Sequence, residues 1–173
     1  VPDERLSRMT VRPIVITGEP VLHQRALPVE SFDGELRALV DDMFETMDAA
    51  EGVGLAANQI GQALRIAVVD ADGERFAMIN PMIVEASGKA SEEEGCLSIP
   101  EVYAEVTRPE RVVLEATGRD GVRYRLEADG LKARACPMET ARWFARFLAR
   151  VGFHLDGDHF LVTSTPTSRP TPK

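Results

Sequence analysis

A disulfide framework, a membrane-spanning run and a basic excess are all missing from this sequence, and each absence excludes a class of protein. The two cysteines are too few for a disulfide scaffold, so free thiols are expected. No apolar run reaches the roughly 18 residues that a membrane helix needs. The net charge of −8 argues against a nucleic-acid-binding surface. We therefore expect a neutral or small partner, with neither nucleic acid nor membrane as a partner.

The chain is long enough to bury one core. Its 173 residues are 44% hydrophobic, which predicts a single folded domain over residues 1–162. Residues 163–173 are rich in Thr, Pro and Ser, and we expect them to form a disordered tail. The first ten residues lack the apolar core of a signal peptide, which favours a cytoplasmic location.

Hydrophobic periodicity predicts a helix, then several strands, then a second helix. Leu36, Val40, Met43 and Met47 recur at helical spacing and indicate a helix over residues 33–49. Short β-rich runs follow at 64–70, 76–84, 102–106, 111–117 and 123–128. Asp120-Gly121 predicts the turn of a hairpin between the last two runs. A second helical pattern covers residues 133–150. This order predicts an α+β fold rather than alternating parallel units.

The stretch "GVGLAANQIG", from Gly52 to Gly61, has two interpretations. Its Gly-x-Gly could belong to a nucleotide-binding loop, but no predicted strand runs into it, as that fingerprint requires. The alternative is the capped end of the first helix followed by a packed segment. Gln59 supplies a side-chain amide that can both donate and accept hydrogen bonds.

The stretch "EEEGCLSIPEVYAEV", from Glu92 to Val106, contains a cysteine in a setting that allows chemistry. Gly95 frees the backbone ahead of Cys96, and the amides of Leu97 and Ser98 follow where they could bind an oxyanion. Cys96 itself is open to three roles: a nucleophile, a metal ligand or a small buried hydrophobe.

Together these segments resemble the bacterial peptide deformylase family. The resemblance is carried by "GEPVLHQRALPVESFD", "GVGLAANQIG", "INPMIVEAS", "EEGCLSIPEV" and "LEADGLKARAC", over roughly residues 11–136. It implies an α+β fold in which antiparallel and mixed strands surround a central helix. It also implies removal of the formyl group from N-formylmethionyl peptides with a divalent iron or zinc ion.

The resemblance also implies roles for individual residues. Cys96 matches the thiolate metal ligand, Gln59 the amide that polarises the formyl oxygen, and Leu97 the residue whose backbone amide shares that oxygen. Glu139 matches the proton-accepting glutamate. The residues implied in substrate binding are Val53 and Gly54 along the peptide backbone, Leu131 and Ala135 around the methionine pocket, and Gly95 and Tyr103 beside the cysteine.

The sequence departs from the family where the third motif should stand. The family has Gln-His-Glu-x-x-His after a stretch like "DGLKARAC", and this alignment reaches residues 137–142, where only Glu139 agrees. Met138 and Arg142 occupy the places of the two histidines. A thioether is a weak ligand for iron or zinc, and a guanidinium would repel a divalent cation.

Three interpretations follow for the function. In the first interpretation, the chain is a deformylase with an unusual metal site that binds iron or zinc. His154, together with His159, then replaces the two lost histidine ligands. Alternatively, it is a repurposed enzyme that acts on a different small substrate without metal, or an inactive protein that binds a peptide or another partner. The side chains at the expected metal site, Cys96, Met138 and Arg142, favour a protein without a bound cofactor. The helical distance from Glu139 to His154, about 22 Å at 1.5 Å per residue, argues against a rebuilt site.

Overall fold

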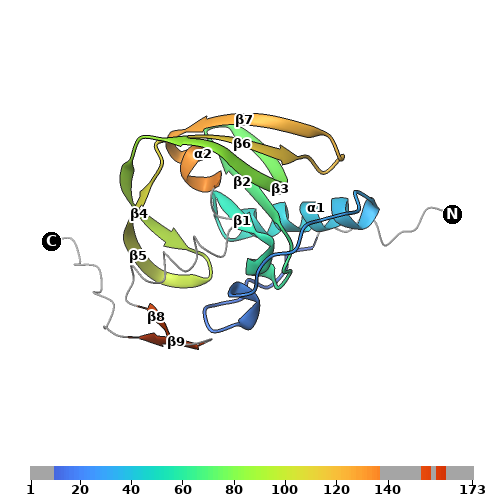
Figure 1. Ribbon diagram of the computed structural model, residues 1–173. Coiled ribbons are helices and arrows are strands. Elements are labelled where there is room, and N and C mark those ends of the chain that lie inside the picture. Colours follow the sequence, from blue (N-terminus) through green and yellow to red (C-terminus); the bar gives the residue numbers. More distant parts are fainter. Residues whose placement is uncertain (1–9, 137–152, 157–158, 163–173) are drawn as a thin grey trace.

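The computed structural model describes residues 10–136 and the backbone of residues 153–156 and 159–162 (Figure 1). The elements in chain order are η2 (Pro20–Leu22), α1 (Gly34–Ala49), β1 (Gly54–Ala56), η3 (Ala57–Ile60), β2 (Ile66–Ala71), β3 (Glu74–Ser87), β4 (Ala90–Cys96), β5 (Ile99–Arg108), β6 (Arg111–Thr117), β7 (Arg123–Asp129), α2 (Gly130–Ala135), β8 (Phe153–Asp156) and β9 (His159–Val162). The predicted α+β class is confirmed.

The strands form one large sheet and two hairpins. The five-stranded sheet has the order β1-β2-β3-β6-β7, while β4 pairs with β5 and β8 pairs with β9. Every ladder between these strands is antiparallel. The predicted turn at Asp120-Gly121 joins β6 to β7, where the Asp120 side chain accepts from the Val122 N–H at 3.0 Å and Gly121 has a φ of 81°.

Helix α1 covers one face of the large sheet, as its apolar stripe predicts. Asp33 caps its first turn by accepting from the Leu36 N–H at 3.0 Å. Val40, Met43 and Met47 are fully buried against sheet residues such as Val68 and Ile79. Burial of each such side chain contributes roughly 1.5–3 kcal/mol, so this contact anchors the fold around the segment that follows the helix.

Helix α2 packs on the opposite face of the sheet. Its small residues Ala133 and Ala135 lie with Cys136 against a cluster that includes Met78 and Leu114. The helix begins at Gly130, three residues before the predicted start at residue 133. The remainder of that predicted helix, residues 137–150, lies outside the described residues, as does the tail 163–173.

The segment from Gly52 to Gly61 agrees with the helix-cap interpretation. The Gly52 N–H donates to the Met47 carbonyl at 2.9 Å and so ends α1. The chain then forms the short buried strand β1, which pattern reading missed because three residues show no alternation. Strand β4 was also missed, because its Glu-rich sequence carries little strand propensity.

Within the described residues, no helix combines the length and apolar character needed to cross a bilayer.

Candidate functional site

Gln59 is held rigidly in the short helix η3, immediately after β1. Its side chain is buried, and Oε1 accepts from the Ala56 N–H at 2.9 Å. This contact fixes which end of the amide faces the site, because only the oxygen can accept from that N–H. Nε2 therefore faces Cys96 Sγ at 3.8 Å and Ser98 Oγ at 3.3 Å. The arrangement presents an N–H donor beside the cysteine.

Cys96 ends strand β4 and opens a tight turn into β5. It pairs with Ile99, so that only Leu97 and Ser98 form the loop. Burial raises the pKa of the Cys96 thiol to about 11, against the opposing effect of the Ser98 and Ile99 backbone N–H groups. Without a metal ion beside it, burial therefore favours the neutral thiol of Cys96 over the thiolate.

Leu97 and Ser98 link this turn to the rest of the molecule. The Leu97 side chain packs against the α1 core, and a Cβ on Gly52 would lie 3.0 Å from Leu97 Cδ1. A side chain at position 52 would therefore require Leu97 to shift by a few tenths of an ångström, and glycine allows the close approach of the two segments without that shift. Ser98 is fully buried, and its carbonyl accepts from the Thr17 N–H at 2.8 Å. The assignment of the Leu97 amide to an oxyanion stays a prediction.

Strand β1 lies at one edge of the five-stranded sheet. Within the described residues its ladder partner is β2, where Gly54 pairs with Val69. The Val53 carbonyl accepts from the Asp70 N–H at 3.0 Å. An edge strand can add an extended peptide through its backbone. Because the Val53 carbonyl is directed toward β2, Gly54 is the one of the two residues whose backbone groups face the open edge.

Four of the six predicted substrate-binding residues line one small cavity of about 200 Å³. They are Val53 from the β1 edge, Gly95 from β4, and Leu131 and Ala135 from α2. The wall also contains Glu93, Glu94 and Arg134, which sequence reasoning did not select. An apolar cavity with charged groups in its wall suits an apolar side chain attached to a polar backbone.

Glu94 belongs to a nearly buried ion pair that stiffens the hairpin. Arg108, at the end of β5, places its Nη2 2.7 Å from Glu94 Oε2, and its Nε is 2.9 Å from Glu94 Oε1. The two side chains are only 4% and 15% exposed. A bidentate pair with so little solvent fixes the orientation of both groups. This pair could not be recognised in the sequence, because Glu94 lies within a run of three glutamates.

Tyr103 is placed differently from the other candidates. It faces Gly95 across the β4–β5 ladder, and a Cβ on Gly95 would lie 3.0 Å from its ring. Glycine at position 95 therefore allows the ring to lie on the backbone. Tyr103 is 57% exposed and is absent from the lining of the small cavity.

The third motif lies beyond the described residues. Glu139, Met138 and Arg142 belong to the segment 137–152, of which nothing is described. His154 lies in β8 paired with Leu161, and His159 lies in β9 paired with Asp156. Among residues whose side chains are described, no group of three His, Cys, Asp or Glu could hold a metal ion.

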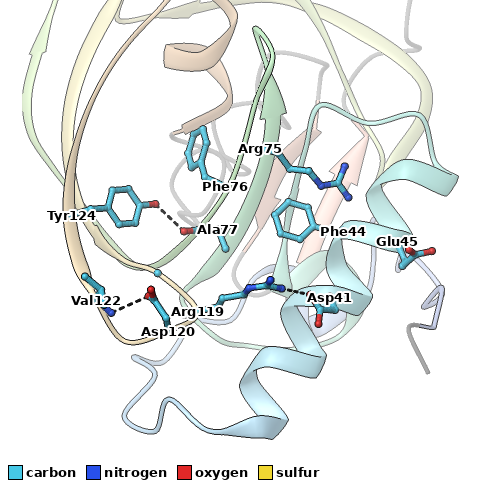
Figure 2. Close-up of a pocket in the computed structure, with 11 residues that line it drawn as sticks. Asp41, Phe44, Glu45, Arg75, Phe76, Ala77, Arg119, Asp120, Val122 and Tyr124 are labelled. Carbon is cyan, nitrogen blue, oxygen red and sulfur yellow. Dashed lines mark hydrogen bonds and ion pairs between the residues drawn. The ribbon is translucent and has the colours of Figure 1, made fainter. Parts of the chain in front are cut away.

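A larger cavity lies elsewhere, between α1 and the turn of the β6–β7 hairpin (Figure 2). It measures about 650 Å³. Arg75 lies 4.4 Å above the Phe44 ring, and the Tyr124 hydroxyl donates to the Ala77 carbonyl at 2.8 Å. None of the predicted site residues lines it. Although this cavity is larger than the one beside Gly95, we do not assign the candidate site to it, because it contains none of these residues.

Fold and site together define a class: an α+β protein whose buried glutamine amide faces a cysteine at a hairpin end, beside a small apolar cavity. The family model "Polypeptide deformylase" matches residues 11–161. A peptide deformylase of Acidobacterium capsulatum is 46% identical, over 93% of this chain and 91% of its own length. One from Brucella suis is 49% identical, over 72% of this chain and 75% of its own.

Solved structures agree with the sequence comparisons. A peptide deformylase from Legionella pneumophila superposes with a TM-score of 0.73 at 36% identity, covering 82% of this chain and 99% of its own. One from Synechococcus elongatus, solved in complex with actinonin, gives 0.72 at 38% identity, over 80% and 76% of the two chains. The chain belongs to the polypeptide deformylase family, which typically uses a divalent metal ion.

Proposed function

We propose that this chain binds short peptides that begin with N-formylmethionine, and that it lacks the metal-dependent hydrolysis of a standard deformylase. The observation that carries the proposal is the Gln59 amide, whose Nε2 faces Cys96 with its orientation set by Ala56. A fixed N–H donor in a buried site is suited to hold a formyl oxygen. The cavity lined by Val53, Leu131 and Ala135 would take the methionine side chain.

The family's metal does not fit the donors that this sequence offers. Iron and zinc in such sites take thiolate and neutral imidazole ligands. This chain supplies Cys96, but Met138 and Arg142 stand where the family has histidines. A thioether donates weakly, and a guanidinium has no lone pair to give.

Binding can be tested separately from hydrolysis. The probes are an N-formylmethionyl tripeptide and the same tripeptide with a free amino terminus, titrated by calorimetry. We expect tighter binding of the formylated peptide, and loss of the difference in Gln59→Glu, which keeps the acceptor for the Ala56 N–H but removes the donor. Equal affinity for both peptides in the unaltered chain would contradict the proposal.

A standard deformylase remains the second candidate, and its support is the name carried by relatives such as the one 46% identical over 93% of the chain. In that case His154 or another side chain completes the site. Formate release from the formylated peptide would then depend on added zinc or iron and disappear in Cys96→Ser. Metal-free release that is lost in Glu139→Gln would instead support a repurposed enzyme.

A further inference from the structure

Strand β7 forms the edge of the large sheet opposite to β1. It follows β6 at the end of the strand order, and in Figure 1 it lies on the outer side of β6. Seven residues pair with β6 without a register shift. No strand in the described part of the chain pairs with its other side. An edge of this length is a template for another strand unless its side chains prevent pairing.

The backbone groups on this outer edge can be assigned from the turn. The Gly118 N–H donates to the Val122 carbonyl at 2.9 Å, so these two residues form a hydrogen-bonded pair. Hydrogen-bonded and non-hydrogen-bonded pairs alternate along an antiparallel ladder. The residues whose N–H and C=O groups are directed away from β6 are therefore Arg123, Arg125, Glu127 and Asp129.

The side chains of these same four residues share one exposed face of the strand. Their charges run in the order positive, positive, negative, negative along "RYRLEAD". When such a strand is laid antiparallel on a copy of itself about Leu126, Arg125 falls opposite Glu127 of the copy, and Arg123 falls opposite Asp129. Each opposite-charge pair occurs twice, and no like charges face each other directly.

We propose that β7 pairs antiparallel with β7 of a second copy of this chain, centred on Leu126, so that two five-stranded sheets become one. Cross-strand pairs of opposite charge stabilise such ladders, and like charges directly opposite destabilise them. Arg125 also lies 2.9 Å from Glu85 and 3.7 Å from Glu115 within its own chain, and Glu127 contacts Arg111. Because a guanidinium has five N–H donors, Arg125 can bind Glu127 of the copy in addition to these carboxylates. Other registers lose this complementarity.

The Leu126 register is tested by charge exchange in the full chain. Sedimentation over a range of concentrations distinguishes the 19.0 kDa monomer from a species of twice that mass. Arg125→Glu and Glu127→Arg each create two like-charge contacts, and each is expected to weaken the dimer about tenfold. The double variant restores opposite charges and should recover the dimer. A thermal unfolding curve confirms that each variant folds.

A cross-link gives an independent measurement. In the proposed ladder Leu126 faces Leu126 of the copy in a non-hydrogen-bonded pair, with Cα atoms about 4.5 Å apart, which a disulfide can span. Leu126→Cys should form a covalent dimer under mild oxidation. Val122→Cys is the control, because the two copies of residue 122 would lie about 27 Å apart at 3.4 Å per residue. A chain that stays monomeric at all concentrations, a dimer indifferent to the charge variants, or equal cross-linking at both positions would overturn the proposal.

Discussion

The peptide side of the site and its metal side differ in how much of the family pattern they keep. On the peptide side, β1, η3 and the β4–β5 hairpin bring Gln59, Cys96 and the small cavity together. On the metal side, an ungapped alignment of residues 137–142 retains only Glu139 of the six-residue motif, and the loss of the metal centre that we infer from it stays a proposal. The contrast teaches that a binding cleft depends on packing distributed over the whole fold, whereas a metal centre depends on two or three donor atoms.

The largest expected effect comes from restoring the metal side. Met138→His with Arg142→His supplies two imidazoles one helical turn apart, the donors that zinc prefers beside a thiolate. We expect zinc affinity to rise by orders of magnitude, measured by competition with a chromophoric chelator. The same double variant carrying Cys96→Ser is the control and should gain much less. No gain in the first variant would show that residues 138 and 142 do not face Cys96.

A large effect on the peptide side should follow from breaking the ion pair behind the cavity. Arg108→Met leaves the Glu94 carboxylate nearly buried without its guanidinium, which costs about 3–5 kcal/mol. Urea unfolding measures this loss. Glu92→Gln, which removes a more exposed carboxylate of the same strand, is the matched control and should change stability little. An unchanged midpoint for Arg108→Met would mean that the hairpin does not depend on this pair.

Gln59→Ala should produce a smaller loss of stability together with a loss of peptide recognition. The substitution leaves the buried Ala56 N–H without its acceptor, at a cost of about 1–3 kcal/mol. Affinity for the formylated tripeptide should fall to that of the unformylated one. If formyl recognition survives in a folded Gln59→Ala protein, the donor lies elsewhere.

Cys96→Ser should have the smallest effect. In the absence of a metal the thiol acts as a small buried group near Gln59 Nε2, and a hydroxyl can also accept from that amide. We expect peptide binding to stay within about threefold, well under 1.4 kcal/mol. A folded variant with strongly reduced peptide binding would mean that the sulfur takes part in the function.

Much of the fold could be predicted because hydrophobic periodicity reports directly on burial. The stripe from Leu36 to Met47 gave α1 to within a residue, and residues 111–117 match β6. Strand β1 has three residues and β4 has four glutamate or glycine residues, so neither carries a periodic signal. Pairing partners, not local sequence, decide such strands.

Some site residues could be predicted from the sequence and others could not, because strand pairing again decides which distant residues meet. Short sequence motifs predicted Gln59, Cys96 and most of the residues that line the cavity. Each of these residues belongs to a motif of consecutive residues, so its place follows from the local backbone. The Glu94–Arg108 pair joins residues 14 apart in a hairpin, and only the register brings them within 2.7 Å. Tyr103 lies on Gly95 outside the small cavity's lining, and its role in substrate binding stays a prediction.

The most direct test is the metal content of freshly purified full-length protein, measured by elemental analysis beside Cys96→Ser. We expect iron, zinc and nickel far below one ion per chain, with the same value for both proteins. One ion per chain in the unaltered protein, absent from Cys96→Ser, would show that Cys96 and other donors of this chain complete a metal centre and would contradict the account.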